Sequence, residues 1–118
     1  MSNQICKALE KINKEIGDQY RICVIDYVPC LYRVFDNGFN VEITGFYSKS
    51  ISLYLWYGEG IGSIMIKAIH NVKLNAACID DEAGKLYEYS MCLISEGYNN
   101  REKIADLMYR GKRLEESS

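Results

Sequence analysis

The segment Tyr32–Ile43, which reads YRVFDNGFNVEI, carries the clearest structural signal in the chain, a β-hairpin centred on Asn37-Gly38. Asn-Gly tolerates positive φ at both central positions of a type I′ turn, whose twist suits the flanking strands. A two-residue turn here predicts the cross-strand pairs Val34 with Val41, Tyr32 with Ile43, and Arg33 with Glu42. In this register the apolar pairs share one face and an Arg33–Glu42 ion pair lies on the other.

Further strands are expected on both sides of this hairpin. Residues 20–28 are rich in aromatic and β-branched side chains, and Pro29 ends that strand or turns it toward a sheet edge. Residues 51–57 alternate between two faces. One face takes Ile51, Leu53 and Leu55, and the other takes Ser52, Tyr54 and Trp56. A glycine-rich turn then leads to a fifth strand at 61–69, which completes an antiparallel meander.

Helices are expected at both ends of the chain. Apolar residues recur at helical spacing from Gln4 to Ile16, with Ser2 or Asn3 as the cap and Gly17 as the stop. A last helix from about Asn100 to Leu114 turns Ile104, Leu107 and Met108 inward, with Asn99 or Asn100 as its cap. Residues 74–96 fit a helical stripe that Gly97 ends, and the alternative is a hairpin within 79–86 followed by an alternating strand. The unbroken apolar content favours the helix.

The predicted fold class is therefore α+β. An antiparallel meander sheet of about five strands packs on N- and C-terminal helices, in two layers. The 118 residues fit a single domain, residues 1–118, with a solvated, disordered tail at about 115–118.

The composition excludes several classes of protein. Lys and Arg total 14 against 16 Asp and Glu, so no strong field draws the chain to nucleic acid or to an anionic membrane. No apolar segment approaches the ~20 residues needed to cross a bilayer, and no signal sequence opens the chain, so the cytoplasm is the expected location. The five cysteines contain no CxxC pair and are interpreted as buried free thiols of a reducing compartment.

No group of residues in the sequence predicts catalysis, a metal site or a cofactor, so the protein is expected not to be an enzyme. His70 is the only histidine, and no ligand stands at metal-binding spacing from it. The run Gly58-Glu59-Gly60-Ile61-Gly62 precedes a strand and not a helix, which predicts a turn with a bulge and not a phosphate loop. Asp80-Asp81-Glu82 lacks the spacing of an EF-hand loop and is interpreted as an exposed helical turn.

Tyrosine content is the feature that indicates binding, because the chain has ten tyrosines and only three phenylalanines. Tyrosine joins a large contact area to a polar tip and is enriched at protein interfaces. If one face of the sheet is uncovered, Tyr54 and Trp56 form an aromatic platform there, unless a second copy covers it in a homodimer. A basic cluster near the C-terminus either offsets a helix dipole or contacts a partner. The predicted binding residues are Tyr54, Trp56, Arg33, Glu42, Arg110, Lys112 and Arg113.

A family resemblance is carried by Tyr32-Arg33, Asp36-Asn37-Gly38, Val41-Glu42-Ile43 and Gly45, followed by the segment Ile51–Trp56. These residues resemble small uncharacterised proteins encoded by phages and prophages of low-GC Gram-positive bacteria. Many such accessory proteins, anti-CRISPR proteins among them, act by stoichiometric binding to a host protein. The resemblance thus implies an inhibitor of a host protein, such as a CRISPR effector or another defence component. The alternatives are an immunity or antitoxin protein that neutralises a toxin, and a single-strand nucleic-acid binder.

Overall fold

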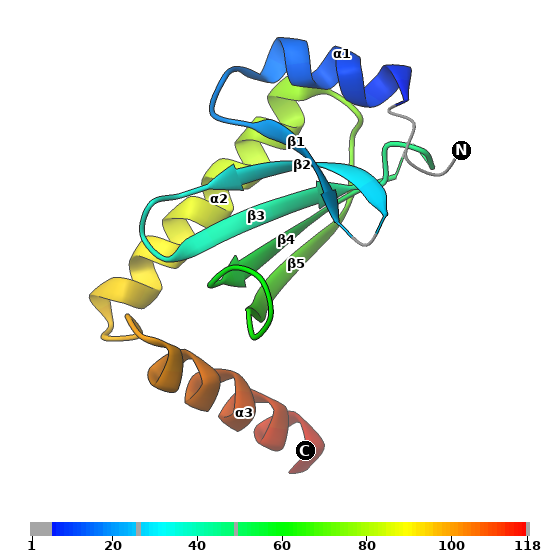
Figure 1. Cartoon of the computed structure of the whole chain (residues 1–118). Helices are drawn as coiled ribbons and strands as arrows, with labels where there is room; N and C mark the ends of the chain where they lie inside the picture. The colour runs from blue at the N-terminus through cyan, green and yellow to red at the C-terminus, as the bar shows by residue number, and fades with distance from the viewer. Residues whose placement is uncertain (1–5, 26, 49, 118) are drawn as a thin grey trace.

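The computed structural model describes residues 6–25, 27–48 and 50–117, with side chains described as far as residue 110. The elements are α1 (Lys7–Ile16), β1 (Arg21–Ile25), β2 (Val28–Val34), β3 (Phe39–Thr44), β4 (Ile51–Tyr57), β5 (Ile64–Val72), α2 (Ala76–Ser95) and α3 (Arg101–Ser117). The strands form one antiparallel sheet in the order β1-β2-β3-β4-β5 (Figure 1). This arrangement confirms the predicted α+β meander.

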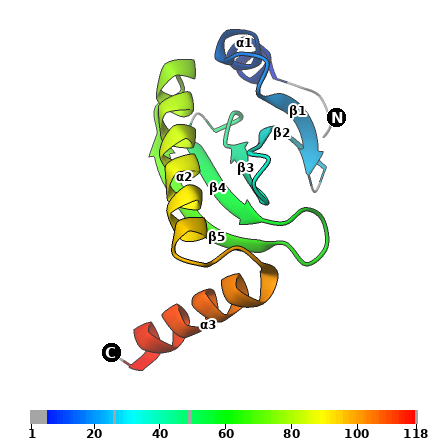
Figure 2. The ribbon, with the colours of Figure 1, turned by 90° about the vertical axis from the view of Figure 1, so that its left-hand side faces the viewer.

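Helices α1 and α2 cover the same face of the sheet (Figures 1 and 2). A cross-strand row of Leu31, Ile43 and Leu53 faces them, and all three side chains are fully buried. The helices contribute Leu9 and the α2 stripe that includes Leu86, which are also buried. Burying such side chains stabilises the fold by about 2 kcal/mol each. The core therefore lies between one face of the sheet and two helices.

The third helix is attached at the end of the sheet. Ile104 near the start of α3 is fully buried, and Leu107 and Met108 pack partly against the core. Figure 2 shows α3 running from beneath the β4–β5 turn toward the side of α2 and away from the body of the molecule. The principal extents of 42 × 26 × 26 Å agree with one projecting element.

The β2–β3 hairpin is confirmed, but its register differs from the predicted one by one residue. Leu31 pairs with Ile43, Tyr32 with Glu42, Arg33 with Val41, and Val34 with Asn40. The loop has three residues, 36–38, and the Phe35 N–H closes it by donating to the Phe39 carbonyl at 3.0 Å. Asn37 accepts a bond from the Phe39 N–H and donates one to the Ser90 hydroxyl of α2. The bond between Asn37 and Ser90 of α2 stabilises this three-residue loop, which is one residue longer than the predicted turn.

The predicted pairs Val34–Val41, Tyr32–Ile43 and Arg33–Glu42 are therefore wrong. Because side chains alternate with period two, a shift of one residue in β2 exchanges the faces of its side chains. Arg33 faces the helices, and Tyr32 faces the opposite side, which we call the outer face.

Several predicted boundaries also change. The strand predicted at 20–28 ends at Ile25, the next strand begins at Val28, and Pro29 lies inside β2 opposite Val24. Strand β5 begins at Ile64 and not at residue 61, because the turn after β4 is longer than predicted. The predicted helix at 74–96 is confirmed as α2, so the alternative hairpin is wrong, and Asn75 caps it through a bond from the Cys78 N–H.

The chain ends are described in part. Helix α1 begins at Lys7, and the predicted start at Gln4 with its caps Ser2 and Asn3 lies outside the described residues. The backbone of α3 is helical as far as Ser117, and Asn100 caps its start by accepting a bond from the Lys103 N–H. None of the helices described is long and apolar enough to span a bilayer.

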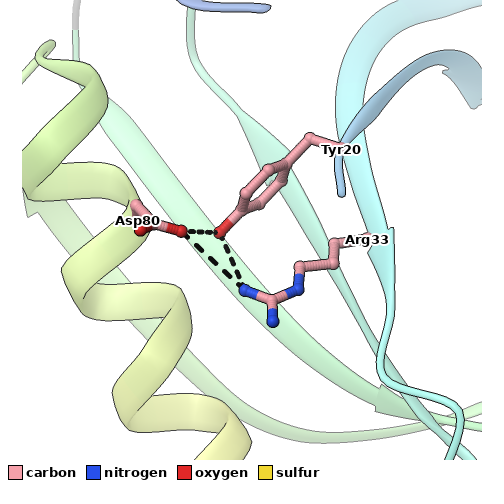
Figure 3. Close-up of polar contacts among 3 residues, drawn as sticks. All are labelled: Tyr20, Arg33 and Asp80. Carbon is pink, nitrogen blue, oxygen red and sulfur yellow. Dashed lines mark hydrogen bonds and ion pairs between the residues drawn. The ribbon is translucent and has the colours of Figure 1, made fainter. Parts of the chain in front are cut away.

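A polar contact ties the second turn of α2 to the sheet (Figure 3). The Tyr20 hydroxyl donates to Asp80 at 2.6 Å, and Arg33 donates to the Tyr20 hydroxyl at 3.2 Å. The Arg33 guanidinium also lies 5.3 Å from the centre of the Tyr20 ring and 3.8 Å from the Asp80 carboxylate. A charged side chain is thus accommodated at the helix side of the sheet because it is stacked and paired.

Candidate binding groove on the outer face of the sheet

The outer face carries a polar and aromatic surface that α1 and α2 leave uncovered. Along β4, Ser52, Tyr54 and Trp56 are half-buried while the residues between them are fully buried. Cross-strand pairing places Glu42 between Tyr32 and Tyr54, and Trp56 between Asn40 and Met65. The prediction that Tyr54 and Trp56 share the face opposite Leu53 is confirmed.

A groove of about 630 Å³ lies on this face, and we call it the outer groove. Strand β1 supplies one side of it, and the turn between β4 and β5 supplies the other. Its lining residues include Arg21, Cys23, Val24, Tyr32, Asn40, Glu42, Trp56, Glu59 and Ile61. The volume is in the range of sites that hold a small molecule or a few side chains of a partner.

The two sides of the outer groove expose apolar side chains to solvent. Ile61 in the β4–β5 turn is fully exposed, and on the other side Ile25 of β1 lines the groove beside its cross-strand partner Val28, which is 46% exposed. Tyr27, in the same hairpin, is exposed as well. Exposed apolar residues gathered around a concave surface are typical of interaction sites.

The polar contacts of the groove fix its shape. The Asn40 side chain is 3% exposed and donates to the Gly58 carbonyl at 2.8 Å, which anchors the β4–β5 turn to β3. The Tyr32 hydroxyl donates to Glu59 at 3.3 Å, and the Arg21 guanidinium stacks 5.7 Å above the Tyr32 ring. Burial, together with the nearby Glu59 carboxylate, raises the pKa of Tyr32 to about 12, so its hydroxyl is a hydrogen-bond donor at neutral pH.

Trp56 contributes a donor that the fold does not use. Its indole Nε1 is buried, and no polar atom of the described residues accepts a hydrogen bond from it. An unsatisfied buried donor costs about 1–3 kcal/mol, so native structures rarely keep one without a reason. The groove also presents carboxylates, a guanidinium and aromatic rings. Aromatic side chains and arginine are enriched at protein interfaces.

The structure brings only some of the predicted binding residues together. Glu42, Tyr54 and Trp56 share the outer face, and the Tyr54 ring packs edge-on against His70 at 5.8 Å. Arg33 was placed beside them by the wrong register, and it lies on the opposite face with Tyr20 and Asp80. The predicted neighbourhood of Arg33 with Tyr54 and Trp56 is therefore incorrect.

The predicted basic cluster lies on α3, away from the outer groove. Arg110 is exposed and forms an ion pair with Asp106 at 3.0 Å, one helical turn earlier. The side chains of Lys112 and Arg113 lie outside the described residues, although the backbone of α3 includes both positions. Figure 2 shows the C-terminal end of α3 directed toward the side of α2.

Sequence reasoning missed Arg21, Tyr32, Asn40 and Ile61 as groove residues. Tyr32 was assigned to the other face by the register error. The others are distant in sequence and meet only because β1 and the β4–β5 turn border the same concave surface. Ile61 could have been recognised from the sequence as a binding candidate. It is a large apolar residue between two glycines in a predicted turn, where a side chain is not expected to join the core.

His70 and the acidic run at 80–82 lie outside the outer groove. His70 is exposed on β5, and its Nδ1 lies 2.9 Å from the Ser52 hydroxyl. Asp80 belongs to the first turns of α2 and has a partner in Tyr20. Over the residues that the structure describes, no group of three or more His, Cys, Asp or Glu side chains could hold a metal ion.

Comparison with protein-family models, with curated proteins and with solved structures found no match to this chain.

Proposed function

We propose that this chain is a non-enzymatic binding protein that holds a segment of a protein partner in the outer groove. The observation that carries the proposal is the position of Trp56 and Tyr32 at an uncovered, concave sheet face, with exposed Ile61 on one side and Ile25 with its exposed partner Val28 on the other. Large aromatic residues inside a depression, surrounded by apolar contacts, are typical of interface hot spots. The unused Trp56 donor supports the same function, since a partner that displaces the ring slightly can supply its acceptor.

The charges of the groove favour a protein over a nucleic acid. The residues that line the groove include two carboxylates, Glu42 and Glu59, and one guanidinium, Arg21, while the Arg101 guanidinium of α3 lies against Gly62 in the β4–β5 turn. A nucleic-acid backbone would meet these two carboxylates there, whereas the C-terminal end of α3, whose sequence contains the basic cluster, is directed toward the side of α2 (Figure 2). A lysine or arginine side chain of a partner would instead find carboxylates and the face of an aromatic ring.

The resemblance to phage and prophage accessory proteins suggests the kind of partner. We propose a host protein in the cytoplasm, such as a CRISPR effector or another defence component, which the chain inhibits by stoichiometric binding. A toxin neutralised by an immunity protein is the alternative partner, and a second copy of the chain is an alternative occupant of the outer face.

The test is capture of the partner by the tagged chain from lysate of a Gram-positive host, with and without nuclease, followed by mass spectrometry. The two groove variants are Ile61→Asp, which changes a fully exposed side chain, and Trp56→Ala. Their matched controls are Met91→Asp and Tyr89→Ala, which change exposed residues of α2.

The expected result is a protein that wild type and both controls retain after nuclease treatment and that both groove variants lose. Retention of the same protein by Ile61→Asp and Trp56→Ala would contradict the proposal. Material that disappears with nuclease, or with added salt, would support nucleic-acid binding instead, because phosphate contacts release counterions.

A further inference from the structure

Two cysteines face each other across the β1–β2 hairpin. Cys23 on β1 is the direct cross-strand partner of Cys30 on β2, so both side chains project from the same face of the sheet. The neighbouring pair is Val24 with Pro29, and Pro29 has no N–H to donate to the ladder. Since hydrogen-bonded and non-hydrogen-bonded pairs alternate, Cys23 and Cys30 form a hydrogen-bonded pair, whose Cα atoms are about 5.5 Å apart.

The Cα spacing lies within the range of a disulfide, whose usual Cα–Cα distance is about 5.5–6 Å. The Cβ atoms of a hydrogen-bonded pair are about 5.5 Å apart, roughly 1.5 Å farther than a disulfide requires, so β1 must move toward β2 for the bond to form. Strand β1 is an edge strand paired with β2 alone, which leaves it free to make that adjustment. Both thiols are free in the structure.

The two thiols differ in their access to solvent. Cys30 is 1% exposed, whereas Cys23 is half-buried and lines the outer groove. Burial, and then the charge of Glu42 and the neighbouring Cys23, raise the pKa of Cys30 to about 12. Cys23 is therefore the thiol that a dissolved oxidant meets first, and Cys30, directly opposite it on β2, is the thiol within reach of the oxidised sulfur. The raised pKa of Cys30 slows this second step, because the thiolate is the attacking species.

We propose that Cys23 and Cys30 are a reversible oxidation site, in which a peroxide converts the two thiols to a disulfide that joins β1 to β2. In the first step the Cys23 sulfur attacks hydrogen peroxide, the O–O bond breaks, and the products are a sulfenic acid and one water. In the second step the Cys30 sulfur attacks the Cys23 sulfur, the S–O bond breaks, and a second water leaves. The two electrons lost by the thiols reduce the peroxide.

The disulfide would fix the strand that forms one side of the outer groove. Cys23, Val24 and Ile25 all line that groove, and the disulfide would hold this segment against β2. Oxidation would thus limit how far the groove can widen. The chemistry of the pair stands apart from the proposed partner binding, and it can be tested without any partner.

The chain offers a direct readout of the disulfide. Trypsin cleaves after Arg21 and Arg33, so Cys23 and Cys30 lie together on the peptide 22–33, which has no other cysteine. The reduced, full-length protein is exposed to hydrogen peroxide, unreacted thiols are alkylated with iodoacetamide, and the tryptic peptides are weighed. We expect peptide 22–33 to carry no alkyl group and to be two hydrogens lighter than the reduced, unalkylated peptide, and to gain both alkyl groups when dithiothreitol is added before alkylation.

Control variants separate the proposal from general thiol oxidation. In Cys30→Ser the resolving thiol is gone, so Cys23 is expected to accumulate as sulfenic and then sulfinic acid. Cys92→Ser removes an exposed thiol of α2 and should leave the oxidation of peptide 22–33 unchanged. The proposal is overturned if both cysteines stay alkylated at a peroxide dose that oxidises most of Cys92. It is equally overturned if wild-type Cys23 ends as sulfinic acid, or in a disulfide with a cysteine other than Cys30.

Discussion

Tyr20 joins three elements through one hydroxyl group. It precedes β1, is 4% exposed, and contacts Arg33 of β2 and Asp80 of α2 (Figure 3). Burial and the bond to Asp80 raise the pKa of Tyr20 well above its ordinary value, so the hydroxyl stays protonated and donates to the carboxylate. A protonated phenol between a carboxylate and a guanidinium satisfies both partners, and the contact fixes where the start of α2 rests on the sheet.

Replacing Tyr20 by phenylalanine tests this contact. The ring remains to stack on Arg33, but the bond to Asp80 and the bond from Arg33 to the hydroxyl are both lost. We expect the free energy of unfolding to fall by about 1 kcal/mol, at the low end for a charged hydrogen bond because Asp80 is half-exposed and water can replace the phenol. Urea denaturation followed by circular dichroism measures it. Tyr27→Phe, at a position 78% exposed, is the control, and equal stabilities of the two variants would contradict the account.

The raised pKa of Tyr32 predicts that the folded state loses stability at alkaline pH. Burial first, and then Glu59, raise it from 10.0 to about 12 in the folded state. Because the unfolded chain ionises at the lower pKa, the contribution of Tyr32 is fully present below pH 10 and is lost as the pH rises from 10 toward 12. Melting temperatures of wild type and Tyr32→Phe between pH 8 and 11 should therefore converge at high pH. Parallel curves would show that Tyr32 does not titrate in this way.

At the scale of elements, the connection between β3 and β4 depends on Gly45. Its φ is +97°, and a Cβ atom there would collide with the backbone carbonyl of Ser50. The connection also buries Phe46, which joins the core. The loop is thus a packed part of the fold in which only glycine fits at this position.

Alanine at two glycines separates backbone strain from steric conflict. Gly60 also has positive φ, but a Cβ atom there meets open space, so Gly60→Ala should cost only about 1 kcal/mol. Gly45→Ala adds the collision with Ser50, and we expect it to cost about 3 kcal/mol or more. Chemical denaturation of the two variants gives the comparison. Similar losses of unfolding free energy in the two variants would mean that the β3–β4 connection can shift to accommodate a Cβ atom at Gly45.

The elements also show how far the sequence could be interpreted. The apolar stripe of α2 and the alternation of β4 were predicted correctly, because each pattern repeats within one element. The Asn37-Gly38 signal predicted the β2–β3 hairpin but not its loop length. Asn37 bonds to Ser90, which is 53 residues away, and no local pattern contains that contact. The single-residue shift that follows is enough to move Arg33 off the outer face.

For the whole molecule, the main feature is that helices cover only one face of the sheet. Tyr54 and Trp56 could be assigned to the uncovered face from alternation alone. The outer groove could not, because its sides come from β1 and from a turn about thirty-five residues later, and no local sequence pattern contains both. The charge balance likewise says little about the groove, where carboxylates and one guanidinium are brought together by folding.

The projecting helix α3 makes a separate prediction about the assembly of the molecule. Ile104 is fully buried at the junction of α3 with the body, whereas Arg110 is exposed beyond it. We expect Ile104→Ala to lower the free energy of unfolding by about 3 kcal/mol, and Arg110→Ala by less than about 0.5 kcal/mol. Thermal melts of both variants check this. Equal effects would mean that α3 is not anchored through Ile104.

The central claim is that the outer groove is the binding surface, and the affinity of the captured partner for groove variants tests it most directly. Isothermal titration calorimetry with wild type, Trp56→Ala, Ile61→Asp and the control Tyr89→Ala gives the four dissociation constants, once melting curves show that each variant is folded. For a hot-spot residue we expect Trp56→Ala to weaken binding by about 30-fold, equivalent to about 2 kcal/mol, with a smaller loss for Ile61→Asp and none for Tyr89→Ala. Unchanged affinity in folded Trp56→Ala and Ile61→Asp would contradict the account and move the binding surface elsewhere.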